Sequence, residues 1–156
     1  MITLDIPGFG PVRLAHLVCD YTGTLTVDGR LVPGVRELLT RLADRLEIHV
    51  VTADTLGTVE TELAGLPCRV HLLTPGKEAQ QKEDYVVQLG AEGVIALGNG
   101  NNDGKMLKAA RIGIAVCLRE GCACAAFSSA DLLVASITDA LGLLFHTLGL
   151  KATLRY

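Results

Sequence analysis

The sequence predicts an α/β protein, a doubly wound, Rossmann-like parallel sheet in a single domain over residues 1–156. Short aliphatic runs alternate along the chain with segments of helical periodicity, and turn residues fall between them. The runs are apolar throughout, which is typical of parallel strands covered by helices on both faces. No repeat and no linker divides the 156 residues, a length that suits one domain.

Six apolar runs are the expected strands of this sheet. They occupy residues 14–20, 46–52, 68–73, 93–98, 112–116 and 131–134. Before them, ITLDI and PVRLA flank the turn sequence PGFG, which predicts a small N-terminal β-hairpin.

Helices are expected between the strands. Pro33 suits the first turn of one helix, and Asp54 or Thr55 can cap the next. Gly90 is typical of the residue just after a helix end. The expected helices end near residues 42, 63, 89, 110 and 146.

Composition argues against several classes of protein. Fourteen Lys and Arg against 17 Asp and Glu give a net charge of −3, and aromatic residues make up only 4%, so a nucleic-acid partner is not expected. No apolar run approaches the ~18–20 residues that span a bilayer, and no signal peptide is recognised. Five cysteines, an odd number, predict reduced core thiols. We therefore expect a cytoplasmic protein with no membrane partner.

Polar residues follow three of the predicted strands. DYTGT (20–24) follows the first strand, Thr52 ends the second, and GNGNND (98–103) follows the fourth, while Lys82 lies in the helix before that fourth strand. In doubly wound sheets the ligand site lies beyond the carboxyl ends of the strands. The sequence therefore predicts a site built from these segments.

These segments resemble the four motifs of the haloacid dehalogenase superfamily, and the first resembles its variant in P-type ATPases. LVCDYTGTLT resembles the first motif, VVTAD the second, QKEDYVVQLG the third and GNGNNDGKML the fourth. They occur in the family's order from Leu17 to about Leu107, as in small proteins described as soluble P-type ATPases. The resemblance implies a Mg²⁺-dependent hydrolase acting on a phosphorylated small molecule.

The resemblance also implies roles for the motif residues. Asp20, the only acid in its segment, would attack phosphorus and carry an aspartyl-phosphate. Mg²⁺ prefers oxygen ligands, and the carboxylates of Asp20 and Asp103 would hold it. Asn99 would contribute a neutral oxygen and Thr22 its main-chain carbonyl.

Two further residues would stabilise the phosphoryl group, Lys82 by its charge and Thr52 by its hydroxyl. Lys77 competes with Lys82 for this role, and we prefer Lys82 because Val86 and Leu89 follow it at helical spacing. The expected catalytic residues are therefore Asp20, Thr22, Thr52 and Lys82.

Two positions depart from the family's pattern. Thr22 stands where phosphatases of the superfamily carry a second Asp as general acid and base, and a threonine hydroxyl cannot take that role. Asn99 stands where an Asp is usual. We expect activated phosphates (ATP-like, aryl or acyl) to be favoured and the phosphoenzyme to hydrolyse slowly. The alternative is a weak or non-catalytic module that kept the fold for regulation or binding.

The spacing between the motifs leaves no room for an inserted cap domain. We therefore expect an open site unless a second subunit, in a homo-oligomer, covers it. The four histidines lie on scattered apolar segments and are assigned no ligand role: His16, His49, His71 and His146.

Overall fold

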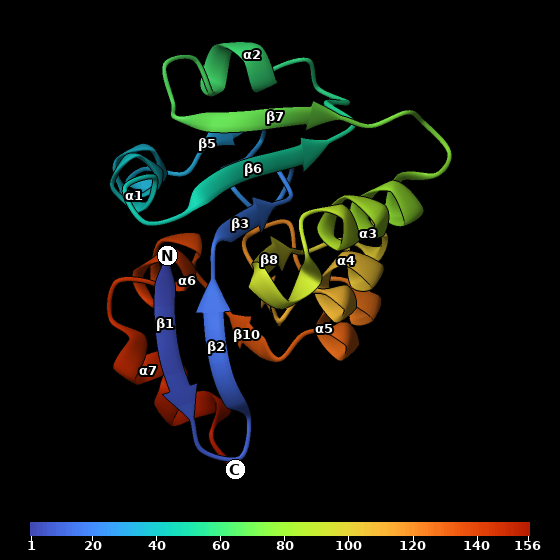
Figure 1. Cartoon of the computed structure of the whole chain (residues 1–156). Helices are drawn as coiled ribbons and strands as arrows, with labels where there is room; N and C mark the ends of the chain where they lie inside the picture. The colour runs from blue at the N-terminus through green and yellow to red at the C-terminus, as the bar shows by residue number, and fades with distance from the viewer.

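A six-stranded parallel sheet forms the centre of the protein, whose computed structural model describes residues 1–156 (Figure 1). In space the strands follow the order β10-β9-β8-β3-β6-β7. The connections run in opposite directions on either side of β3, as in a doubly wound sheet, so the predicted fold class is confirmed. The strands are β3 (His16–Cys19), β6 (Glu47–Thr52), β7 (Cys68–Leu72), β8 (Val94–Gly98), β9 (Ile112–Val116) and β10 (Leu132–Val134).

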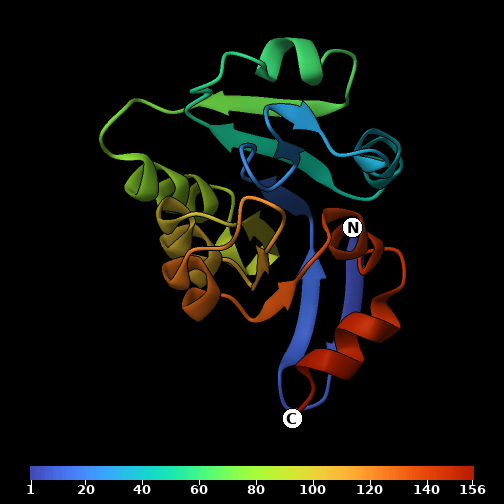
Figure 2. The same cartoon turned by 180° about the vertical axis from the view of Figure 1, so that it is seen from behind.

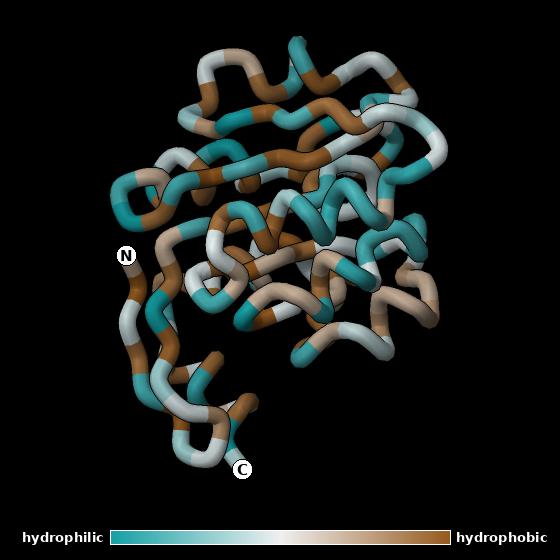
Figure 3. The backbone as a smooth tube through the Cα atoms, turned by 45° about the vertical axis from the view of Figure 1, so that its right-hand side comes forward, coloured by the Kyte–Doolittle hydropathy of each residue, from teal (hydrophilic) through white to brown (hydrophobic).

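Helices cover both faces of the sheet, as Figures 1 and 2 show from opposite sides. The first face carries α3 (Glu78–Gln88), α4 (Gly104–Ala109) and α5 (Cys124–Ser129). The second carries α1 (Val35–Leu42) and α6 (Ile137–Gly142). The short helix α2 (Val59–Glu62) lies between β6 and β7 in the chain, and 3₁₀ turns span Ala91–Gly93 and Asn101–Asp103. The hydrophobic colour of the central strands in Figure 3 reflects burial from both sides.

The predicted N-terminal hairpin is present, formed by antiparallel strands β1 (Ile2–Ile6) and β2 (Gly10–Leu14). The prediction of one final helix reaching residue 146 is wrong. The chain turns after α6 and forms a second helix, α7 (Thr147–Leu154), which packs against the hairpin. Because Leu150 and Leu154 are buried in one cluster with Ile2 and Ile6, the turn is what gives the hairpin its apolar cover.

Two other expectations need correction. The third apolar run was expected to be covered on both faces, but β7 is an edge strand on which Val70 and Leu72 are 42% and 62% exposed. All five thiols are free, yet only Cys19 is buried in the core, and Cys124 is exposed. No helix is long and apolar enough to cross a membrane.

No inserted domain interrupts the sheet. The segment after β3 forms only a small flap of two antiparallel strands, β4 (Thr26–Val27) and β5 (Arg30–Leu31). Its turn needs left-handed backbone at Asp28 (φ 52°) and Gly29 (φ 76°), which suits these two residue types. The flap stands beside the carboxyl end of the sheet.

Candidate active site

The carboxyl ends of β3, β6 and β8 meet around a pocket of about 310 Å³. Each of the four motifs contributes to its wall, although Asp20 and Asn99 are 79 positions apart in the sequence. The expected residues that line it are Asp20, Thr22, Thr52, Lys82 and Asn99.

Lys82 lies at the centre of the site. Its ammonium nitrogen Nζ is 2.6 Å from Asp20 Oδ1 and 2.6 Å from Asp103 Oδ1. The side chain is only 1% exposed, a burial that a lysine tolerates because its charge is paired. Lys77, the alternative that the sequence left open, lies exposed at the start of α3 and away from both carboxylates.

Asp103 is held rigidly by the backbone of the loop that precedes it. Its Oδ2 accepts hydrogen bonds from the N–H of Asn99 at 2.9 Å and of Gly100 at 2.8 Å. A Cβ on Gly98 would lie 2.6 Å from the Cβ of Asp103, so this close packing requires glycine. The glycines of GNGNND thereby fix where the buried carboxylate points.

The two carboxylates and the ammonium set each other's protonation. Burial, together with the charge of Asp103, raises the pKa of Asp20 to about 7, although Lys82 and Thr24 act in the opposite direction. Burial alone would lower the pKa of Lys82, but the two carboxylates outweigh it and raise that pKa. The ammonium therefore stays charged, and once Asp20 is ionised one lysine is shared by two carboxylates, so the cluster is then one positive charge short.

Thr24 is a site residue that the sequence reasoning did not single out. Its Oγ1 lies 3.1 Å from Asp20 Oδ2 and 3.2 Å from Asn99 Oδ1. A hydroxyl has one hydrogen, so it can donate to only one of these oxygens at a time. Asn99 is also held from its other end, because its Nδ2 donates to the carbonyl of Gly121 at 3.2 Å. The position of Thr24 inside DYTGT was the available signal.

Thr52 is oriented by its own loop. Its Oγ1 accepts a hydrogen bond from the N–H of Asp54 at 3.0 Å, which leaves the hydroxyl hydrogen free to donate into the pocket. Thr22 is half-buried in the pocket wall two residues after Asp20. The structure therefore places both threonines beside the carboxylate pair.

Acidic side chains stand at the outer rim of this pocket. Asp54 and Glu120 both line it, and Lys82 is the only cationic residue in the lining. Glu120 also accepts a hydrogen bond from the N–H of Asp28 at 3.0 Å, which ties the flap to the far side of the site. Sequence reasoning missed Glu120, which lies outside all four motifs.

The donor set fits a hard divalent cation. The Asp20 and Asp103 carboxylates, the Asn99 side-chain oxygen and the Thr22 carbonyl are all oxygen donors, the type that Mg²⁺ prefers. The shortage of one positive charge beside two buried carboxylates is what such an ion would supply. These residues would hold the ion, and the charge balance, rather than any single contact, supports the assignment.

No family model matches the chain. The chain is 48% identical over 62 residues to the uncharacterized protein MJ0073 of Methanocaldococcus jannaschii, a match covering 40% of this chain and 67% of that one. It is 44% identical over 39 residues to MJ0072 of the same organism, over 25% of this chain and 89% of that one. The chain belongs to the family of these archaeal proteins.

Solved structures extend the comparison. A HAD superfamily (subfamily III A) hydrolase from Legionella pneumophila matches with a TM-score of 0.71 at 14% identity, over 90% of this chain and 87% of that one. The chain has the haloacid dehalogenase fold. The 3-deoxy-D-manno-octulosonate 8-phosphate phosphatase of Moraxella catarrhalis, in complex with magnesium, phosphate and KDO, matches with a TM-score of 0.65 at 15% identity. This match covers 85% of this chain and 86% of that one. A zinc-transporting PIB-type ATPase matches at 0.62 and 23% identity, over 79% of this chain and 20% of that one. The resemblance inferred from the four motifs is thus confirmed at the level of the fold.

Proposed function

We propose that the protein is a Mg²⁺-dependent phosphohydrolase that forms an aspartyl-phosphate on Asp20. The observation that carries the proposal is the buried Asp20–Lys82–Asp103 cluster, with both 2.6 Å ion pairs, at the floor of a pocket at the strand ends. A haloacid dehalogenase fold with magnesium and phosphate bound in one neighbour supports it.

In the proposed reaction a carboxylate oxygen of Asp20 attacks phosphorus, and the bond from phosphorus to the leaving oxygen breaks. Lys82 and the Thr52 hydroxyl stabilise the charge on the phosphoryl oxygens. When bound, Mg²⁺ would neutralise the repulsion between the carboxylate and the phosphate. Water then attacks the phosphorus of the aspartyl-phosphate, releasing inorganic phosphate and restoring the Asp20 carboxylate.

Thr22 favours activated substrates in this scheme. It cannot donate a proton to a poor leaving group, so aryl and acyl phosphates, and donors like ATP, lose least from its presence. The absence of an acid at Thr22 also favours a second candidate function, a module that binds or accepts phosphate without fast turnover.

The test is hydrolysis of p-nitrophenyl phosphate and acetyl phosphate, with Mg²⁺ or with EDTA. We expect Asp20→Asn to abolish turnover while the fold survives, because the amide has nearly the same shape but cannot attack phosphorus. Asp5→Asn, on the exposed face of the N-terminal hairpin, is the matched control and should keep full activity. Turnover retained by Asp20→Asn would contradict the covalent route, and inactive wild type that still binds phosphate would favour the second candidate.

A further inference from the structure

A second cluster of titratable side chains lies at the amino ends of the strands, opposite the active site. His16 begins β3, and Glu47 and His49 lie at the start of β6. The parallel register pairs His16 with Glu47, so all three side chains project from the same face of the sheet. This group, the His16–Glu47–His49 cluster, is at the amino ends of the strands, whereas the active site is at their carboxyl ends.

Three ligand atoms converge in this cluster. His16 Nδ1 lies 3.2 Å from His49 Nε2, and Glu47 Oε2 lies 3.8 Å and 3.9 Å from these two nitrogens. Zn²⁺ bonds to His nitrogen and to carboxylate oxygen are about 2.0–2.2 Å long, so ligand atoms of a tetrahedral site lie roughly 3.3–3.5 Å apart. The two nitrogens, 3.2 Å apart, are about a tenth of an ångström closer than this, and the Glu47 side chain, 54% exposed, is free to move the few tenths of an ångström by which its oxygen is too far.

The buried member of the cluster is oriented by a partner on α3. His49 is fully buried, and its Nδ1 lies 2.9 Å from the hydroxyl of Tyr85. When Nδ1 carries the hydrogen and donates it to Tyr85, the lone pair of Nε2 faces His16 and Glu47. Such a hydrogen bond to the outer nitrogen is what orients metal-binding histidines in general.

The charge state of His49 also suits a ligand. Burial, together with the neighbouring His16, lowers the pKa of His49 to about 4, so the ring is neutral at neutral pH. In that tautomer, with the His49 Nδ1 hydrogen donated to Tyr85 and no ion bound, His16 Nδ1 donates its hydrogen to His49 Nε2. On binding, that hydrogen would move to His16 Nε2, which leaves the Nδ1 lone pair for the ion.

The competing interpretation is a histidine pair that only satisfies its own hydrogen bonds. That interpretation accounts for the 3.2 Å contact and leaves Glu47 paired with Arg69 alone, whereas the Glu47 oxygen also lies within 4 Å of both histidine nitrogens. Arg69, with NH2 3.5 Å from Glu47 Oε2, opposes a cation at this place, but its side chain is 72% exposed and can turn to solvent.

We propose that His16, Glu47 and His49 form a binding site for a divalent transition-metal ion, Zn²⁺ being the ion whose ligand types and spacing fit best. Three protein ligands leave a fourth position for water. Because the ligands come from the first residues of two central strands, the bound ion would link β3 to β6 and stabilise the fold.

The test is calorimetric titration of the untagged chain with Zn²⁺ in excess Mg²⁺, which occupies the active site. We expect the wild-type chain to bind one Zn²⁺. His16→Ala should lose this binding, and Glu47→Gln should bind the ion at least about tenfold more weakly. At roughly 100 times its Kd, Zn²⁺ should raise the wild-type Tm by about 5–10 °C and leave that of His16→Ala unchanged.

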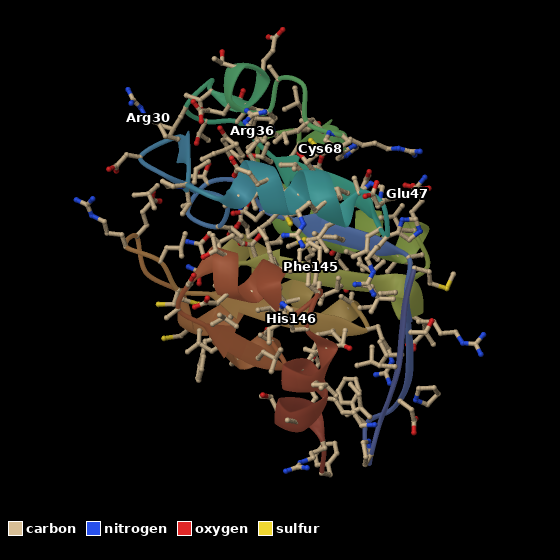
Figure 4. The ribbon with its side chains drawn as sticks, turned by 90° about the vertical axis from the view of Figure 1, so that its left-hand side faces the viewer. Arg30, Arg36, Glu47, Cys68, Phe145 and His146 are labelled. Atoms are coloured by element: carbon tan, nitrogen blue, oxygen red, sulfur yellow. The ribbon has the colours of Figure 1, made fainter.

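The control is His146→Ala, which removes an exposed histidine in another part of the surface (Figure 4). It should bind Zn²⁺ like wild type. Both cluster substitutions are at accessible positions and leave buried His49 intact, so the variants should fold. Equal Zn²⁺ stoichiometry and affinity in wild type, His16→Ala and Glu47→Gln would overturn the proposal.

Discussion

Thr22 decides which half of the proposed reaction is slow. It lies in the pocket two residues beyond Asp20, where its hydroxyl can neither protonate a leaving alkoxide nor take a proton from the attacking water. The aspartyl-phosphate should therefore form from activated donors and persist. We expect Thr22→Asp to raise steady-state hydrolysis of alkyl phosphates by up to ~10²-fold, and of aryl phosphates by less, since general acid–base help contributes ~10²–10⁴-fold.

Turnover of one aryl and one alkyl phosphate by wild type, Thr22→Asp and Thr22→Asn measures this effect. Thr22→Asn is the control, because it has nearly the size of Asp without the acid. Acid quenching should trap a phosphoenzyme in wild type that disappears in Thr22→Asp. Fast hydrolysis of alkyl phosphates by wild type, with nothing trapped, would mean that another group supplies the proton transfers.

At the scale of elements, β3, the loop after β8 and helix α3 force two carboxylates to share one ammonium. This arrangement predicts a pH dependence. The folded chain keeps the Asp20 proton up to about pH 7, whereas the unfolded chain releases it near the ordinary pKa of 3.8. Without metal, the stability from this group is therefore lost as the pH rises from about 4 through about 7. Mg²⁺ favours the ionised form, so its stabilising effect should grow over the same interval.

Thermal unfolding in EDTA and in Mg²⁺ between about pH 5 and pH 8 tests this. The difference in Tm between wild type and Asp20→Asn isolates the group. In EDTA, wild type should lose stability relative to Asp20→Asn as the pH rises, because the variant lacks the second buried charge. The rise in Tm caused by Mg²⁺ should be larger at about pH 8 than at about pH 5. A Mg²⁺ effect independent of pH would mean that the ion does not bind the Asp20 carboxylate.

The elements that the sequence predicted best are those whose burial is complete. Strands β8 and β9 are unbroken apolar runs because helices cover both of their faces. The run that became β7 carries Arg69 and His71 and lies at the edge of the sheet, where most of its side chains are exposed. The turn between α6 and α7 was missed because it depends on the hairpin that α7 covers.

The candidate site was predictable for a different reason. Its residues lie in short, contiguous motifs, and the resemblance to the superfamily implied which of these motifs act together. Thr24 and Glu120 could be identified only from the three-dimensional structure, because Thr24 acts through its contact with Asn99 and Glu120 through its contact with the flap. The His16–Glu47–His49 cluster could not be found from spacing, because it depends on the register that sets His16 beside Glu47.

For the whole molecule, the open pocket and its acidic rim limit which leaving groups are accepted. Asp54 and Glu120 line the pocket, no inserted domain covers it, and Lys82 is already shared by two carboxylates. A nucleoside diphosphate leaving group brings further negative charge to this rim, whereas an aryl group brings none. We therefore expect the kcat/KM for ATP to be lower than that for aryl phosphates, in part through repulsion by the rim.

Glu120→Lys tests this repulsion, because Glu120 is exposed and outside the motifs. Exposed charge interactions are worth ~0.2–1 kcal/mol, so the variant should raise kcat/KM for ATP by about 1.4-fold to fivefold at low salt, and less at high salt. The kcat/KM for p-nitrophenyl phosphate should change little, which separates the charge effect from any loosening of the flap that Glu120 holds through the Asp28 N–H. Asp5→Lys makes the same change in net charge on the distant hairpin and should leave both substrates unaffected. If Asp5→Lys improves ATP turnover equally, the net charge of the molecule, and not its rim, governs selection; if neither variant changes it, the leaving group does not pass Glu120.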